Sequence, residues 1–294
     1  MIKQTIVITS PCRLSLRNRL MVIARGGDEE PVTRPIADIG ILILENQLTT
    51  ITLPLINALA AENVLVAVCD DRHIPASIIT PIEGNVTQAE VLRAQCDISE
   101  PLKKQAWKQI VTSKIENQRA VLNRCGRDGS LLNAYARNVL SGDTSNREGA
   151  AARLYWNEMF FAGFTRDRDA DGLNALLNYG YSILRAATVR ALIGSGLSPA
   201  FGLFHRNRYN AYPLADDVME PYRPFVDMEV NRLWEEGIEK LNKKSKKVLV
   251  DVMTCDVAMD RTLRPLSLAL SSTTASLASF IKRKTKILNL PRVP

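Results

Sequence analysis

The pattern of apolar residues changes once along this chain, near residue 84, and that change limits the folds it can adopt. Before it, apolar residues come in short runs or alternate, at residues 6–8, 14–16, 20–23, 39–44 and 64–68. Runs rich in Val, Ile and Leu and bounded by Pro, Gly, Asn or Asp are typical of β-strands. Residues 53–62 instead have helical spacing, with Pro54 suited to a first helical turn. The first 84 residues are therefore predicted to form a small β-rich domain with one helix.

Helix formers dominate from residue 85 onward, and Pro and Gly fall mostly between periodic stretches. Ser99 is placed to begin a helix with Trp107, Ile115 and Leu122 on its apolar face, and Gly126 is placed to end it. Further helices are expected near residues 130–140, 146–162, 173–193, 214–241 and 257–270, with polar connectors at 167–172 and 243–247. The predicted fold class is α+β: a β-rich domain of residues 1–84 joined to a larger, mostly helical domain of residues 85–294.

Composition excludes several classes of protein. With 294 residues, of which 46% are hydrophobic, the chain can bury a sizeable core. Its 38 Lys and Arg against 31 Asp and Glu give a net charge of +7, which favours polyanionic partners without identifying one. Five cysteines without a C-x-x-C pair argue against a disulfide framework and a zinc knuckle. No membrane span or signal peptide is expected, and the predicted location is the cytoplasm.

A carboxylate near the start of one predicted helix is the first candidate for chemistry. Ser145 and Glu148 have the S-x-x-E spacing of a capping box, in which each side chain bonds a free backbone N–H of the helix start. However, Glu148 shares a helical stripe with Ala152, Tyr155 and Met159, which should face the core. A carboxylate on a buried face must be paired, hydrogen bonded or bound to a cation. The sequence leaves both interpretations open.

His205 is the second candidate, and it is one of only two histidines in the chain. A lone histidine is more often a structural residue than a metal ligand. Its neighbours favour a function here, because Arg206 and Arg208 form a basic strip that could contact phosphates while the imidazole binds a cation.

Three carboxylates follow within five residues, at Asp216, Asp217 and Glu220. On a helix, either aspartate could share a face with Glu220, and like charges so close repel unless a cation lies between them. Pro221 and Pro224 cannot donate backbone hydrogen bonds, so a kink that frees backbone carbonyls is expected. The alternative is an acidic first turn that complements the helix dipole, which explains the aspartates better than Glu220.

No spacing rule unites these separate candidates, because only the fold can bring them together. Two carboxylates and one imidazole would suit Mg²⁺ or Mn²⁺ with open positions for water and phosphate oxygens, rather than a closed zinc site.

Three ordered motifs resemble those of one known family. S-N-R-E-G-x-A-A-R, F-G-L-x-H and L-A-D-D-x-M-E-P-Y-R-P resemble the CRISPR-associated endonuclease and spacer integrase family, and E-P-Y-R-P resembles its type II branch. The similarity extends over nearly the whole chain. It implies a β domain that dimerises and a helical catalytic domain with a Mg²⁺ or Mn²⁺ site. Carried over by motif position, Glu148, His205 and Glu220 would be the catalytic metal ligands, and Asp217 a further acidic contact.

The same resemblance implies insertion of short duplex DNA into a CRISPR array, by attack of 3′-hydroxyl ends on repeat phosphodiesters. The implied partners are double-stranded DNA, a second copy of the chain and a small CRISPR-associated bridging protein. Two alternatives stay open: a general metal-dependent nuclease for branched DNA, and a noncatalytic DNA-binding scaffold. The basic segments 243–247 and 282–286 could hold the DNA backbone. Candidate phosphate contacts beside the motifs are Arg147, Arg206, Arg208 and Arg223.

Overall fold

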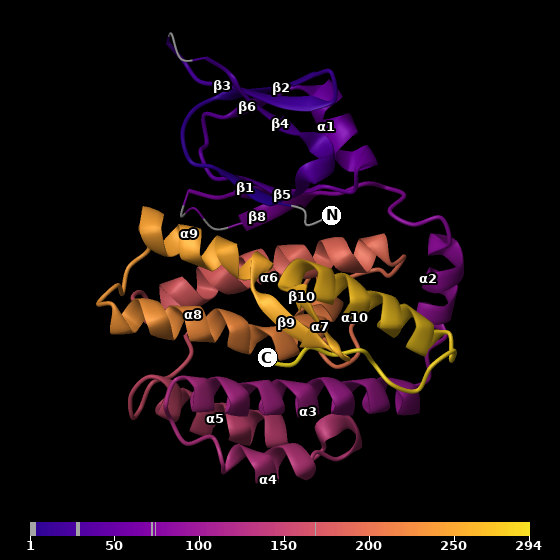
Figure 1. Ribbon diagram of the computed structural model, residues 1–294. Coiled ribbons are helices and arrows are strands. Elements are labelled where there is room, and N and C mark those ends of the chain that lie inside the picture. The colour runs from indigo at the N-terminus through magenta and orange to yellow at the C-terminus, as the bar shows by residue number, and fades with distance from the viewer. Residues whose placement is uncertain (1–3, 28–29, 72, 74, 168) are drawn as a thin grey trace. The chain divides into compact units, whose positions relative to one another are not determined.

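The computed structural model describes residues 4–27, 30–71, 73, 75–167 and 169–294 (Figure 1). The chain divides into two compact units, Met1–Val86 and Thr87–Pro294. Strands dominate the first unit and helices the second, which confirms the predicted α+β class.

In its described residues the first unit has two four-stranded sheets, one α-helix, α1 (Leu53–Ala61), and a 3₁₀ turn at Ile36–Asp38. Parallel pairing joins β1 to β5 and β5 to β7, whereas β8 is antiparallel to β7. Leu14, Met21, Leu42, Leu55 and Val66 form part of a shared buried core. In sheet order the strands are β1 (Gln4–Ile8), β5 (Ile39–Leu44), β7 (Leu65–Cys69) and β8 (Pro75–Ile79), and then β4 (Val32–Pro35), β3 (Leu20–Ala24), β2 (Arg13–Arg17) and β6 (Thr50–Ile51).

The second unit is built around two long helices, α3 (Glu100–Arg124) and α6 (Leu173–Gly194). α4, α5 and α8 pack on α3, and α8, α9 and α10 pack on α6. Large aromatic side chains, among them Trp107, Tyr155 and Phe225, are fully buried between them. The other helices are α2 (Gln88–Cys96), α4 (Leu132–Arg137), α5 (Arg147–Met159), α7 (Pro213–Met219), α8 (Arg223–Glu235), α9 (Lys243–Asp251) and α10 (Leu266–Ile281).

Three of the sequence predictions for this unit are wrong. Residues 257–270 were expected to be helical, but a hairpin of β9 (Asp256–Met259) and β10 (Thr262–Pro265) precedes α10, and Asp260 turns between the strands at φ 52°. The expected connector at 243–247 is the first part of α9, because Asn242 and Ser245 form a capping box. The helical stretch expected at 214–241 ends earlier, because α8 (Arg223–Glu235) stops at Glu235. No described helix has the length and apolar character that crossing a membrane requires.

Candidate metal centre

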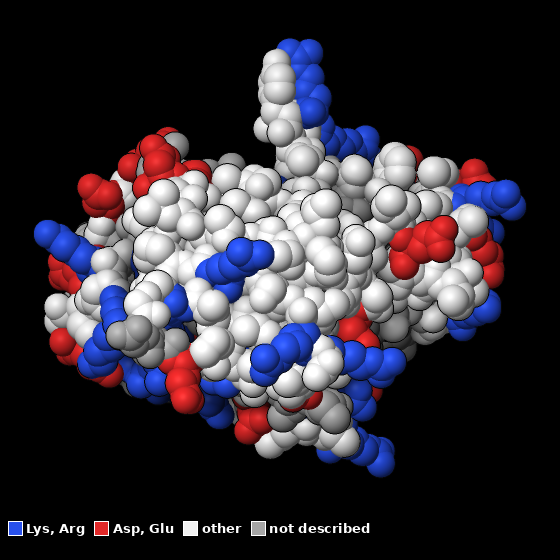
Figure 2. Space-filling view, turned by 90° about the horizontal axis from the view of Figure 1, so that it is seen from above, with Lys and Arg blue, Asp and Glu red and all other residues white. Residues whose placement is uncertain are grey.

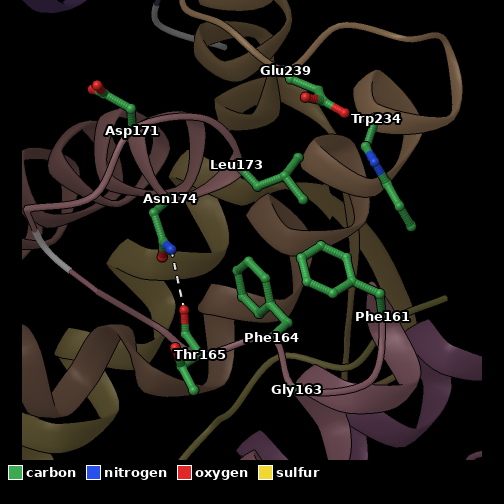
Figure 3. Close-up of a pocket in the computed structure, with 9 residues that line it drawn as sticks. All are labelled: Phe161, Gly163, Phe164, Thr165, Asp171, Leu173, Asn174, Trp234 and Glu239. Carbon is green, nitrogen blue, oxygen red and sulfur yellow. Dashed lines mark hydrogen bonds between the residues drawn. The ribbon is translucent and has the colours of Figure 1, made fainter.

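A cavity of about 330 Å³ in the second unit does not involve the candidate residues. Figure 3 shows its aromatic side, where Phe161 and Phe164 lie near Trp234, and the hydrogen bond of 3.1 Å from Asn174 Nδ2 to the Thr165 carbonyl. None of Glu148, His205, Asp217 and Glu220 lines this cavity. The candidate chemistry therefore lies elsewhere in the unit.

The side chain of Lys114, on α3, joins two of the predicted ligands. Its Nζ lies 2.5 Å from Glu148 Oε1 and 2.5 Å from Glu220 Oε2. The Lys114 side chain is only 10% exposed and that of Glu220 only 6%, so the pair is withdrawn from solvent. The fold therefore brings the carboxylates of α5 and of the α7–α8 junction together on the Lys114 ammonium. Glu148 is paired, as a carboxylate on that stripe must be, although its side chain is half-buried and 27% exposed.

The capping-box interpretation of Glu148 is wrong. Helix α5 is capped instead by Asn146, which is left-handed at φ 48° and accepts from the Gly149 N–H at 3.2 Å. The Asp143 carboxylate accepts from the N–H groups of Arg147 and Glu148, at 2.8 and 2.9 Å. Because these groups satisfy the helix start, the Glu148 side chain is available to meet Lys114.

The third predicted ligand, His205, is oriented by Asp217. His205 Nδ1 lies 2.6 Å from Asp217 Oδ1, and the imidazole is 41% exposed while the carboxylate is fully buried. A hydrogen bond at Nδ1 fixes the ring orientation and leaves Nε2 as the nitrogen that can bind a cation. Asp217 thus positions the histidine. The sequence could not distinguish this role from direct contact of Asp217 with the metal ion.

A short backbone turn holds the Asp217 carboxylate in place. Its Oδ2 accepts from the N–H groups of Leu203 and Phe204 at 2.6 and 3.1 Å, and its Oδ1 from that of His205 at 3.2 Å. A Cβ at Gly202 would lie 2.5 Å from the His205 carbonyl oxygen and 3.2 Å from Asp217 Oδ2. Only glycine allows the turn to close this tightly over the carboxylate.

The helix break predicted at the two prolines is confirmed, and it places Glu220. α7 ends at Met219, a 3₁₀ turn spans Glu220–Tyr222, and α8 begins at Arg223. The carbonyl of Asp217 is not left free as expected, because the Glu220 N–H donates to it in the tighter 3₁₀ pattern. The Pro221 carbonyl accepts from Asn117 Nδ2 at 2.8 Å, which ties the break to α3 beside Lys114.

The three neighbouring carboxylates do not share one cation. Asp216 pairs with Arg185, at 2.8 Å from Nε to Oδ1, whereas Asp217 faces His205 and Glu220 faces Lys114. The acidic cluster of the sequence therefore divides among three partners, and only Glu220 joins Glu148.

Electrostatics link all three predicted ligands. Burial alone would raise the pKa of Glu220, but Arg223 and Lys114 lower it below its ordinary value. The hydrogen bond that His205 Nδ1 makes to the Asp217 carboxylate raises the pKa of His205, and the charge of Glu220 adds to that rise. Burial would lower the pKa of Lys114, but Glu220 and Glu148 raise it overall. Glu220 therefore stays ionised at neutral pH, as a carboxylate that binds a metal must be.

These donors fit a divalent cation. Two carboxylates and an imidazole nitrogen are ligands that Mg²⁺ or Mn²⁺ accepts, with positions left for water and phosphate. Glu220 Oε2 is buried and accepts no hydrogen bond in the described structure, although the Lys114 ammonium touches it. Within the described ranges, no three His, Cys, Asp or Glu side chains already surround a single point, since Lys114 lies between the two glutamates.

Two of the predicted phosphate contacts lie on the exposed segment after His205. Arg206 Nη2 lies 2.6 Å from Glu100 Oε2, and the two side chains are 68% and 53% exposed. The Arg208 guanidinium lies over the Tyr209 ring, 4.7 Å from its centroid. Both arginines are held by weak surface contacts, which phosphate can replace.

The other two arginines differ in their contacts. Arg223 Nε donates to Glu220 Oε1 at 2.8 Å, and its guanidinium lies 4.5 Å from the centroid of the Tyr181 ring. Arg147 lies beside Glu148 at the start of α5, and its Nε has no hydrogen-bond partner among the described residues. Contact of either with phosphate stays a prediction.

Lys114 is the residue of this centre that sequence reasoning missed. It lies on the same helical face as Trp107, Val111 and Gln118, three to four residues apart, and all four are buried. A lysine on such a face must be paired. The pattern therefore indicated that Lys114 is a buried cation. It did not indicate which carboxylates would pair with it.

A second buried carboxylate, Asp227 on α8, ties together the helices around the centre. It accepts hydrogen bonds from the hydroxyls of Tyr155, on α5, and Tyr181, on α6. Burial raises its pKa to about 7, and the two tyrosine hydroxyls only partly oppose the rise. Between pH 4 and pH 7 the folded chain therefore holds a proton that the unfolded chain has lost. The stability that protonated Asp227 contributes is fully present below about pH 4 and is lost as the pH rises through 7.

The Asp227→Asn variant is expected to lose this pH dependence, because an amide does not titrate. From pH 5 to pH 8, the free energy of unfolding of the wild type should fall by roughly 2–3 kcal/mol more than that of the variant. Urea unfolding at both pH values measures the difference, with exposed Asp251→Asn as the control. Parallel pH dependence in wild type and Asp227→Asn would contradict the assignment.

Comparison with known proteins assigns a family to this arrangement. The family model described as "CRISPR associated protein Cas1" matches residues 5–254. The chain is 38% identical to the CRISPR-associated endonuclease Cas1 of Neisseria meningitidis serogroup C (strain 8013), over 99% of this chain and 96% of that protein. It is 29% identical to CRISPR-associated endonuclease Cas1 2 of Pyrobaculum aerophilum, over 79% of this chain and 83% of that protein.

Solved structures show the same fold. A casposase bound to integration product superposes with a TM-score of 0.80, at 22% identity over 98% of this chain and 93% of that one. A chain of a partial Cas6-RT-Cas1–Cas2 complex superposes with a TM-score of 0.66, at 18% identity over the full length of both. Sequence and fold agree: the chain belongs to the Cas1 family of CRISPR-associated proteins.

Proposed function

We propose that this chain is a metal-dependent DNA endonuclease and integrase that inserts short duplex DNA into a CRISPR array. The observation that carries the proposal is the meeting of Glu148 and Glu220 on the Lys114 ammonium. His205 is oriented by Asp217, and Glu220 acts on it electrostatically. The relatives named CRISPR-associated endonuclease Cas1, and the casposase bound to integration product, support the same reaction class.

Glu148, His205 and Glu220 would hold a Mg²⁺ or Mn²⁺ ion, through carboxylate oxygens and the imidazole Nε2. When bound, the ion supplies positive charge that favours loss of the 3′-hydroxyl proton and neutralises charge on the scissile phosphate. Arg223 and Lys114 keep Glu220 ionised and fix its orientation. Asp217 accepts from His205 Nδ1 and so holds the ring in the orientation in which Nε2 would face the ion.

The reaction exchanges one phosphodiester for another. The donor 3′-oxygen forms a bond to phosphorus, the bond from phosphorus to the repeat 3′-oxygen breaks, and the departing oxygen gains a proton in place of the one lost by the attacking hydroxyl. Water in place of the 3′-hydroxyl gives hydrolysis at the same centre. The chain supplies no covalent intermediate in this scheme; its residues position and stabilise charge.

Double-stranded DNA is the proposed partner of the basic side chains. Arg147, Arg206, Arg208 and Arg223 adjoin the centre, and Lys243, Lys244 and Lys247 lie along α9. Figure 2 shows acidic and basic side chains interspersed among uncharged ones, so the basic side chains do not form one continuous patch in that view. Binding should weaken steeply as salt concentration rises, because phosphate contacts release counterions.

A second copy of the chain and a small bridging protein complete the proposed assembly. Large apolar side chains in the first unit are exposed, including Leu48 at 75% and Leu53 at 73%, and a second copy would cover them. The solved Cas6-RT-Cas1–Cas2 complexes, whose chains share this fold, support a Cas2-like partner.

A strand-joining assay tests the proposed function. Purified protein, its bridging partner, a short duplex with free 3′ ends and a repeat-bearing plasmid are mixed with Mn²⁺ or with chelator. Joined strands are expected only with Mn²⁺, and duplexes with dideoxy 3′ ends should give none. Hydrolysis with both kinds of end and no joining would favour the general nuclease. DNA binding without either product would favour the scaffold.

A further inference from the structure

The segment that carries His205 exposes aromatic rings to solvent. Phe201 is 51% exposed, Phe204 46% and Tyr209 80%. Large apolar rings lose favourable burial when they face water, so a cluster of them beside a reactive centre indicates a surface that a ligand covers. Arg206 and Arg208 lie between these rings in the sequence, as in surfaces that bind single-stranded nucleic acid.

Phe204 is the ring whose geometry indicates the ligand. One of its faces stacks on Trp107, with centroids 4.4 Å apart and planes 3° from parallel. Trp107 is 1% exposed, so it forms the closed end of the stack. Because Phe204 itself is 46% exposed, its other face is open.

The imidazole of His205 lies beside this stack. Its centroid is 5.8 Å from the Trp107 ring and 5.8 Å from the Phe204 ring, at 84° and 86° to their planes. A flat group added to the open face of Phe204 would continue the stack directly next to the metal centre. The sugar and phosphate attached to such a group would then lie near His205.

We propose that the open face of Phe204 is a binding site for one unpaired nucleobase of the DNA strand at the metal centre. The proposal rests on the proposed function. A nucleobase is flat, carries a π face whatever its sequence, and is joined to the phosphate that the centre must hold. The base comes either from the 3′ end of the donor strand or from the repeat nucleotide at the scissile phosphate.

The positive charge of Arg206, close to Phe204 in the sequence, suits the phosphate of a nucleotide whose base stacks on that ring. Arg206 follows His205 directly, and its contact with Glu100 joins two exposed side chains, so a phosphate can replace the carboxylate at little cost. Phe201 is a contrast on the same segment, since no described aromatic ring stacks on it. The base is therefore assigned to Phe204 and not to every exposed ring.

Photocrosslinking tests the site. Two DNA substrates carry 5-iodouracil, one at the donor 3′ terminus and one at the repeat nucleotide next to the scissile phosphate, and a distant dye reports binding by anisotropy. The full complex is irradiated in chelator, so that no strand is joined, and the adduct is mapped by mass spectrometry. The variants are Phe204→Leu, which keeps apolar contact with Trp107, Phe204→Tyr, which keeps an aromatic face, and Phe201→Leu as the matched control.

An adduct on Phe204 is expected with one of the two substrates, which identifies the source of the base. It should persist on the new ring in Phe204→Tyr and disappear in Phe204→Leu, whose DNA affinity should be about fivefold or more weaker. Phe201→Leu should keep both the adduct and the wild-type affinity. DNA that binds without an adduct at position 204, or equal affinity losses in Phe201→Leu and Phe204→Leu, would overturn the site. Absence of DNA binding by the wild type would instead overturn the proposed function, and the site with it.

Discussion

Replacing His205 by alanine is expected to reduce metal-dependent strand joining by a factor on the order of 10³, while DNA binding stays within about twofold. The imidazole is 41% exposed, so its removal leaves no large buried cavity. Asp217 keeps its three backbone donors from Leu203, Phe204 and His205, so the turn should remain folded. The loss should therefore fall on the chemistry alone.

The chain offers a matched control, because it has only one other histidine. His73→Ala should join strands at a rate within a few-fold of the wild type. Initial rates of joining, with anisotropy to measure DNA binding, compare the two variants. Equal rates for His205→Ala and the wild type would exclude His205 from the centre, and equal losses in both variants would indicate a general effect of removing imidazole.

Replacing Lys114 by methionine is expected to destabilise the metal-free chain by about 3–5 kcal/mol. The change keeps much of the side-chain volume but removes the cation that Glu148 and Glu220 share. Two carboxylates then face each other without the ammonium between them, and that of Glu220, only 6% exposed, keeps its pairing with Arg223. Urea unfolding in chelator measures the loss. Lys108→Met, an exposed lysine on the same helix, should cost less than about 1 kcal/mol.

Mn²⁺ should restore more stability to Lys114→Met than it adds to the wild type. No ammonium competes for the carboxylates in the variant, and a ligand that binds only the folded chain stabilises it in proportion to its affinity. Repeating the unfolding series with Mn²⁺ measures this gain. Equal gains in the two proteins would show that Lys114 and the ion do not share the same carboxylates.

Much of the fold could be predicted because fully buried strands have continuous runs of apolar residues, which are easy to recognise in a sequence. Residues 39–44 and 64–68 read as strands and lie in β5 and β7, at the centre of their sheet. The missed strands β4, β6 and β8 lie at sheet edges, where exposed residues weaken the pattern. The β9–β10 hairpin was missed because its strands have four residues each and lead directly into a helix.

The site could be predicted only in part, because its members converge through tertiary contacts. Motif position indicated Glu148, His205 and Glu220, but no spacing links α5, the His205 segment and the α7–α8 junction. The ammonium of Lys114, 34 residues before Glu148, is what joins two of them in the fold. The orienting role of Asp217 depends on a turn at Gly202 that no local pattern predicts.

Diffraction from crystals soaked in Mn²⁺, recorded for anomalous scattering, tests the central claim most directly. The account predicts one manganese peak per chain within coordinating distance of Glu148, His205 and Glu220, and no peak there in crystals of His205→Ala. A peak bound by other residues, or Lys114 still in contact with both glutamates at saturating Mn²⁺ with no peak between them, would contradict it.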